Sequence, residues 1–224
     1  KGNKFIIIFN IYFMKHITPF KIFEADIMPA KIEDDSQVNS FESAVAFGER
    51  NDFDVVEYDE FYNSLGDDDK RTAPPSRGVP FFALFHPERK RPMFVVCDKN
   101  VFRFMPMKEI ISDIIGHEKV HAEQAIRRGN LEFNLPDPRD RKAYFSNKEE
   151  VMAFAFTIAN GLSKTNRSLE TAMSQLDIPF NPRSAMRPAE HTMLWADIKR
   201  YCDEKTIKRY RKYIYLYLEK KYSG

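Results

Sequence analysis

Apolar residues recur with two different spacings along the chain, and the change falls near Pro106. Before it, three short runs rich in β-forming residues occupy 79–86, 92–98 and 101–105, with polar linkers between them. Runs of this length and separation are typical of consecutive antiparallel strands. The pattern therefore predicts an antiparallel strand meander in this part of the chain.

The N-terminal region, residues 1–64, mixes short apolar clusters with acidic stretches. The run Phe5–Phe13 predicts a β-strand, since a membrane span needs about 20 apolar residues; a leader ahead of Met14 is the alternative. A short capped helix is expected at 40–50, and a strand leading into a helical turn at 53–65. Residues 65–78 combine charges, Pro-Pro and glycine, which predicts a loop.

After Pro106 the apolar spacing becomes helical. The residues that carry it are Ile110, Ile111, Ile114, Ile115 and Val120. This spacing predicts a helix that runs to Arg128, where Gly129 and Asn130 supply a stop. Residues 135–147 contain two prolines and predict a second loop. A further helix is then expected from a cap at Ser146 or Asn147 to Gly161.

The C-terminal segment, residues 188–224, predicts one long amphipathic helix. Between Lys199 and Lys221 nine basic residues stand against three acidic ones, so this stretch has a net charge of about +6 and the rest of the chain about −4. Its apolar stripe predicts docking on the rest of the protein. The alternative is that the basic face binds an acidic protein, nucleic acid or an anionic surface.

The overall composition is that of a globular domain, with 43% hydrophobic and 30% charged residues in 224. The small net charge does not by itself indicate a nucleic-acid or membrane partner. Two cysteines exclude a disulfide framework and indicate a reducing, cytoplasmic compartment. No apolar run is long enough for a transmembrane segment, and one structural domain is expected overall.

Two of the five histidines, His117 and His121, lie four residues apart within the predicted helix. At 3.6 residues per turn, side chains with this spacing project from the same face. Two imidazoles placed this way can bind one Zn²⁺ ion, which prefers three protein ligands in catalytic sites. Glu118, one residue round from His117, is then placed to take a proton from a water molecule that the zinc activates.

This HExxH pattern would arise by chance in roughly one of a hundred chains of this composition. Its position inside a predicted helix, after predicted strands, strengthens the metal interpretation. The alternative is a solvent-exposed helical turn with two ordinary histidines.

A third ligand has to come from another segment, and the next helix begins with the adjacent acids Glu149 and Glu150. HEKVHAEQ followed by EEVMAFAF resembles the gluzincin branch of zinc metallopeptidases, and especially small peptidase-like proteins of phages and bacteria with HExxHxxQ and a later E-[IV]-x-A-x-A helix. The resemblance covers residues 110–160. It implies that His117, His121 and Glu150 bind zinc and that Glu118 is the general base; Glu149 is the alternative third ligand.

The chain also departs from that family. Thermolysin-like members carry an acid four residues after the ligand glutamate, where this chain has Ala153 or Phe154. Asp113, one turn before His117, is an alternative partner for a ligating imidazole. Gln124 continues the histidine face and is expected to contact a loop or substrate, or to pack at the surface.

Peptide hydrolysis also needs a donor to the developing oxyanion and a place for the substrate backbone. Tyr144 and His191 are the candidates for the donor. The strand at 101–105 or the one at 92–98 is expected to pair with the substrate as an edge strand.

The sequence thus predicts an α+β, zincin-like fold, with a catalytic core at 79–187 and the basic helix at 188–224. The expected function is zinc-dependent hydrolysis of protein or peptide substrates. The alternative is a structural or interaction protein, virion-associated if it comes from a phage, that keeps the HExxH fold without proteolysis.

Overall fold

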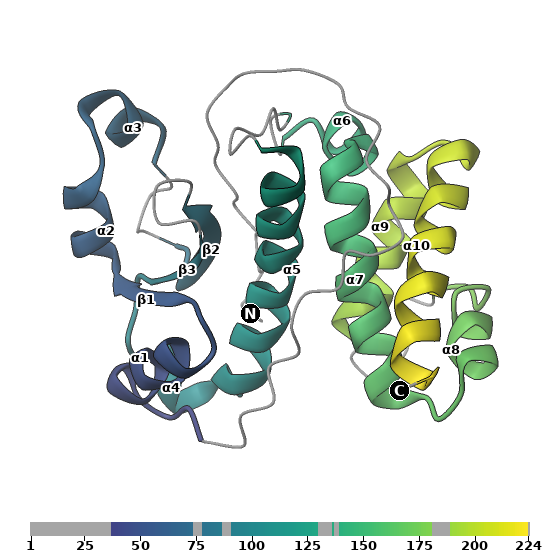
Figure 1. Cartoon of the computed structure of the whole chain (residues 1–224), viewed down its shortest axis with the longest axis horizontal. Coiled ribbons are helices and arrows are strands. Elements are labelled where there is room, and N and C mark those ends of the chain that lie inside the picture. Colours follow the sequence, from purple (N-terminus) through teal and green to yellow (C-terminus); the bar gives the residue numbers. More distant parts are fainter. Residues whose placement is uncertain are drawn as a thin grey trace, which may run out of the picture. The chain divides into compact units, whose positions relative to one another are not determined.

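The computed structural model describes residues 37–73, 78–86, 91–129, 136, 139–180 and 189–223. The strand predicted at Phe5–Phe13 lies outside these residues. The chain divides into two compact units (Figure 1), of which the first contains the described residues up to 129 and the second those from 136 onwards. We call them the sheet unit and the helical unit.

The sheet unit is built on a sheet of three strands in the described ranges. Their bounds are Asp54–Glu57 (β1), Phe81–His86 (β2) and Arg91–Val96 (β3). The strand order is β1-β3-β2, with β1 parallel and β2 antiparallel to the central strand β3. Among the described residues, five helices belong to this unit: Phe41–Arg50 (α1), Tyr58–Ser64 (α2), Asp67–Thr72 (α3), Val101–Phe104 (α4) and Met107–Arg128 (α5).

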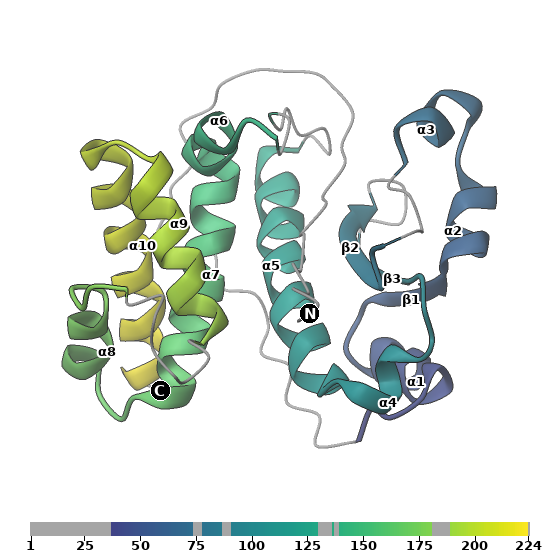
Figure 2. The ribbon, with the colours of Figure 1, turned by 180° about the vertical axis from the view of Figure 1, so that it is seen from behind.

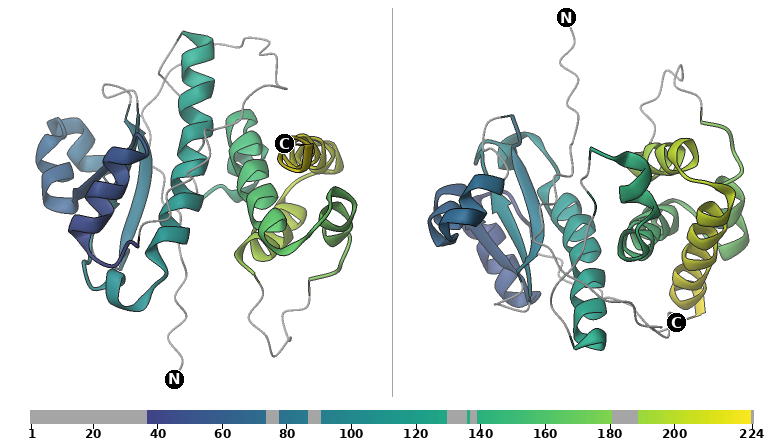
Figure 3. Two further views of the ribbon diagram at one scale, coloured as in Figure 1. Left: turned by 60° about the horizontal axis from the view of Figure 1, so that its bottom comes forward. Right: turned by 90° about the horizontal axis from the view of Figure 1, so that it is seen from above.

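Each face of the sheet is covered because side chains alternate along every strand. Phe81, Phe94 and Val96 point to the face that packs on α1, α4 and α5. The neighbouring residues Phe82 and Val95 belong to the opposite cluster, which α2 covers. Figure 3 shows the strands with α2 on one side and α5 on the other. The long helix α5 is therefore fixed to the sheet through one apolar face.

In the helical unit, the part of the chain that the structure describes forms five helices. They span Arg141–Ser146 (α6), Lys148–Thr165 (α7), Leu169–Gln175 (α8), Glu190–Tyr201 (α9) and Glu204–Ser223 (α10). α7 lies alongside α10 and also contacts α6, α8 and α9 (Figure 2). Residues 150–155 of α7 are all buried. A helix that is apolar nearly all round is expected at the centre of its unit, and α7 holds that place.

Aromatic donors from α9 and α10 fix the ends of the other helices. The last carbonyl groups of a helix have no partner within it. Trp195 Nε1 donates to the Leu176 carbonyl after α8, at 2.9 Å. Tyr210 Oη donates to the Phe145 carbonyl near the end of α6, at 2.9 Å, and Tyr222 Oη to the Asn166 carbonyl after α7, at 2.8 Å. The C-terminal helices are thus an integral part of this unit.

The strand predictions were right for two of the three runs. β2 and β3 form the expected antiparallel pair, but Val101–Phe104 is the short helix α4. The third strand of the sheet is β1, which joins β3 in parallel. Because β3 is hydrogen-bonded on both sides and α4 is helical, neither proposed segment is an edge strand for a substrate. That expectation was wrong.

The predicted helices were placed correctly along the chain, but several of their predicted boundaries differ from the observed ones. α1 begins at Ser40, which forms a capping box with Ser43, and α5 ends at Gly129 with φ +65°. The loop at 65–78 contains the helix α3, and the second loop contains α6. α8 was not predicted at all.

Two helix predictions in the C-terminal half of the chain were wrong in their boundaries. α7 continues past Gly161 to Thr165. The single C-terminal helix is two helices, α9 and α10, and Asp203 Oδ1 accepts the Thr206 N–H at the start of α10, at 2.7 Å.

The described residues confirm an α+β protein that is mostly helical. None of the helices in the described ranges has a stretch long and apolar enough to cross a membrane.

Candidate metal centre

The two histidines of the motif lie in the middle of α5, as their spacing predicts. Their ring centroids are 5.0 Å apart, and the rings are inclined by 76°. His117 is 4% exposed and His121 is 2% exposed. The alternative of a solvent-exposed turn with ordinary histidines is therefore wrong, because both imidazoles are buried.

Gln124 follows His121 by three residues and contacts its ring. The distance between Gln124 Oε1 and His121 Nδ1 is 3.1 Å, and Gln124 is fully buried. A surface role for this residue is excluded by its burial. The sequence contained a signal for this contact, since residues three apart on a helix are neighbours.

Glu118 and Lys119 follow His117 directly and do different things. Glu118 is 1% exposed. Lys119 is half-buried, and its Nζ donates to the carbonyl of Asn51 at the end of α1, at 2.8 Å. Burial lowers the pKa of Lys119, and the nearby charge of Asp52 opposes that change. Lys119 thus anchors α5 to α1, while Glu118 is the buried carboxylate of the motif.

Glu149 and Glu150 are distinguished by their burial in the first turn of α7. Asn147 caps this helix, and its side-chain oxygen accepts the Glu149 N–H at 2.9 Å. One residue further round the helix, Glu150 is fully buried, whereas Glu149 is half-buried. Both acids lie at the positive end of the helix dipole, which favours a carboxylate. Burial singles out Glu150 as the candidate ligand.

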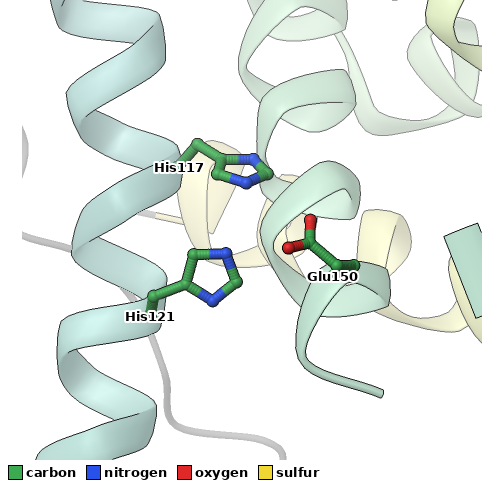
Figure 4. A group of neighbouring side chains, drawn as sticks. All are labelled: His117, His121 and Glu150. Carbon is green, nitrogen blue, oxygen red and sulfur yellow. The ribbon is translucent and has the colours of Figure 1, made fainter. Parts of the chain in front are cut away.

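His117, His121 and Glu150 form a group that could hold a metal ion. Each offers one ligand atom, and these atoms all lie within 4.8 Å of one another. Figure 4 shows the two imidazoles on α5 and the carboxylate on α7. Two imidazole nitrogens and one carboxylate oxygen are a donor set that suits Zn²⁺.

The other residues proposed from the sequence have different positions. Asp113 is half-buried on the turn before His117. Tyr144 is buried in α6, where its ring packs against Phe145 and Phe154, with centroids about 5.8–5.9 Å away. The role of either residue in a reaction stays a prediction.

His191 packs against Gly161, whose missing side chain makes room for it. A Cβ atom at position 161 would lie 2.4 Å from His191 Nδ1. Gly161 is eleven residues after Glu150, which corresponds to about 16 Å along a helix. This position argues against His191 as an oxyanion donor beside Glu150.

Tyr210 of α10 lies near enough to Glu150 for the charge of that carboxylate to act on it, which the sequence did not reveal. Burial raises the pKa of Tyr210 well above its ordinary value, and the charges of Cys202 and Glu150 act in the same direction. The sequence placed Tyr210 on the apolar docking stripe. Its hydrogen bond to Phe145 gives it a second role, at the turn that leads into α7.

A shallow depression at the start of α10 is lined by both acidic and basic side chains. The depression, of about 680 Å³, is lined by Asp203, Glu204, Lys205, Lys208, Arg209 and Lys212. Lys208 Nζ pairs with Glu204 at 2.8 Å. On the other side, Tyr210, Ile214 and Leu218 are buried, which confirms the amphipathic docking of this helix. Binding of an acidic partner or nucleic acid stays a prediction.

No protein-family model, curated protein or solved structure matches this chain. The likeness to gluzincins therefore rests on the motif and on the residues that surround it.

Proposed function

We propose that the protein is a zinc-dependent peptidase with a zincin-like catalytic centre formed by His117, His121, Glu150 and Glu118. The observation that carries the proposal is the concentration of buried polar side chains. Among the residues that the structure describes, the buried polar or charged ones are Asp54, His117, Glu118, His121, Gln124, Glu150 and Thr206.

Two of these seven have an evident structural role. Asp54 forms an ion pair with Arg91, and Thr206 lies in the capped first turn of α10. The remaining five belong to the motif helix and to the first turn of α7. Burial of ionisable groups is costly, and proteins accept it where the groups are paired, hydrogen-bonded or bound to a metal. Four such groups, with the neutral polar Gln124 beside them, lie in two short segments and support a functional site.

The three candidate ligands are close to the spacing that zinc requires. In a tetrahedral site, ligand atoms that lie about 2.0–2.2 Å from zinc are about 3.3–3.6 Å from one another. The three candidate ligand atoms all lie within 4.8 Å of one another, so side-chain rotations would have to bring them closer by up to about 1.5 Å. A zinc ion held there would act as a Lewis acid that lowers the pKa of water and polarises a peptide carbonyl.

Glu118 is the residue that would move the proton. Its carboxylate is buried, and it follows the first histidine of the motif directly on α5. As general base it accepts a proton from the attacking water, and it then returns that proton to the nitrogen of the leaving amine. A site that only stabilises a fold has no use for such a base.

One observation favours the alternative, a structural or interaction protein that keeps the metal centre without proteolysis. The position four residues after Glu150 is Phe154, which is buried among aromatic rings. An acid that orients a catalytic partner in thermolysin-like members is therefore replaced by a hydrophobic packing residue.

Elemental analysis of the purified protein tests the metal centre. We expect one zinc ion per chain in the wild type, in Glu149→Ala and in Glu118→Gln. In Glu150→Ala we expect the affinity for zinc to fall at least about 100-fold, since one ligand supplies a sizeable fraction of the binding free energy. A wild-type protein that binds no zinc when it is supplied would refute the proposal.

Digestion of a peptide library then separates the two functions. Cleavage by the zinc-loaded wild type, absent in Glu118→Gln, supports a peptidase. Full zinc content in both proteins with no cleavage in either would favour the structural alternative.

A further inference from the structure

We propose that Gln124 is a positioning residue for His121, which fixes the ring so that its Nε2 atom faces the metal. The inference rests on the proposed metal centre and adds a residue to it. It starts from the contact between Gln124 Oε1 and His121 Nδ1, which are 3.1 Å apart.

The chemistry of the two atoms sets the direction of this hydrogen bond. The side-chain oxygen of glutamine has no proton and can only accept. His121 Nδ1 therefore carries the proton and donates it. In a neutral imidazole the other nitrogen, Nε2, is then left with its lone pair, which is the form that binds a metal.

The surroundings keep this arrangement in place. Gln124 is fully buried and His121 is 2% exposed, so water does not compete for either atom. Both residues belong to α5 and are three positions apart, so the helix itself sets their separation. The separation of the two side chains is therefore a local property of α5.

A neutral acceptor also has an electrostatic consequence. In many zinc sites a carboxylate accepts the proton of the ligating imidazole and makes that imidazole more basic. Gln124 orients the ring without adding negative charge. Of the three candidate ligands, Glu150 is the one anion. With neutral Gln124 as the acceptor, the centre would keep more positive charge to act on a substrate carbonyl than with a carboxylate at this position.

The tautomer of His121 is measurable in the full-length, metal-free protein by nitrogen NMR of ¹⁵N-labelled histidine at pH 8, with a His121→Asn variant to assign the signals. We expect the Nδ1–H form in the wild type. In Gln124→Leu we expect a mixture with the Nε2–H form, because Leu fills similar space and cannot accept a proton. An Nε2–H ring in the wild type, or the same tautomer in Gln124→Leu, would overturn the proposal.

Zinc affinity by chelator competition is the second readout. Gln124→Leu should bind zinc about 10- to 100-fold more weakly, as expected for loss of a partner of a metal ligand. Gln124→Glu restores an acceptor and should recover the affinity. Arg127→Gln, on the exposed side of the same helix, is the control and should bind like the wild type.

The two proposals fail in different ways. Equal affinity in Gln124→Leu and the wild type would overturn the role of Gln124 and leave the metal centre standing. A wild-type protein with the Nδ1–H tautomer that binds no zinc would refute the metal centre, while the orienting hydrogen bond would stand.

Discussion

The helices α5 and α7 both carry candidate ligands, yet they are buried in opposite ways. α5 has an apolar side, with Ile111 and Ile115 against the sheet, and it buries the polar residues His117, His121 and Gln124 as well. α7 is buried almost all round at its N-terminal half, and Glu150 is the one charged residue among the six buried residues 150–155.

This difference decides what the sequence can reveal about each helix. On α5 the candidate chemistry lies on one helical face, so the spacing of the residues is enough to find it. On α7 the burial of the candidate ligand depends on the helices that surround it. Glu149 and Glu150 have the same residue type and almost the same sequence context, and packing alone makes one of them fully buried.

The largest expected effect is the loss of peptide cleavage on substitution of Glu118, which would separate catalysis from zinc binding on α5. Glu118→Gln should lower peptide cleavage about 10²- to 10⁴-fold, because it removes the proposed general base and keeps the shape of the side chain. Glu123→Gln, on the same helix and half-buried, is the matched control and should keep its activity within about twofold. Equal activity in the Glu118 variant and the wild type, measured at saturating zinc, would remove Glu118 from the mechanism.

The two cysteines provide one probe for each unit. Burial raises the pKa of the Cys97 thiol, at the end of β3, to about 11. Burial is also the largest cause that raises the pKa of Cys202, between α9 and α10.

A raised pKa means that folding favours the neutral thiol of Cys97. This contribution to stability is present below the pKa of the unfolded chain and is lost as the pH rises towards 11. At pH 8 we expect Cys97 in a Cys202→Ser variant to react with iodoacetamide about 100-fold more slowly than in the denatured protein. A rate close to that of the denatured chain would show that Cys97 is accessible and ionises normally.

The aromatic caps of the helical unit give a smaller effect. Tyr210→Phe leaves the buried Phe145 carbonyl without its donor and should reduce the free energy of unfolding by about 1–3 kcal/mol. Tyr215→Phe is a matched control on the same helix, since its hydroxyl donates to Glu219 at the exposed surface. There we expect a change within about 0.5 kcal/mol, measured by urea denaturation. Equal losses in the two variants would contradict a special role for the buried donor.

The smallest expected effect concerns Gly161. Alanine is the better helix former by about 1 kcal/mol, but its Cβ would overlap the His191 ring. Overpacking costs about 1–3 kcal/mol, so we expect Gly161→Ala to lose about 0–2 kcal/mol overall. The double variant with His191→Ala should be more stable than His191→Ala alone. Additive effects in this double-mutant cycle would mean that the two residues do not interact.

The sequence predicted those parts of the fold in which local signals agree with packing. The capped start of α1, the pair β2–β3 and the end of α5 at Gly129 are confirmed. The candidate ligands His117 and His121 were proposed from the same kind of local signal, one spacing on one helix. Their role as metal ligands stays a prediction.

The wrong predictions come from residues whose local preference is overruled by their neighbours. Val101–Phe104 is rich in β-forming residues, yet a single helical turn buries Val101 and Phe102. Gly161 looks like a helix stop and instead makes room for His191. The spacing of Gln124 and His121 signalled their contact, but the full burial of Gln124 depends on packing that the sequence does not show.

The mixed pairing of β3 has a consequence for the order in which the sheet unit assembles. Its antiparallel partner β2 is close in the sequence, with His86 opposite Arg91, whereas the parallel pair joins Asp54 to Met93. The shorter loop costs less entropy to close, so we expect β2 and β3 to pair first and β1 to dock afterwards. α5 packs against β2 and β3. We therefore expect the helix that carries the two histidines to pack on the β2–β3 pair before β1 joins the sheet.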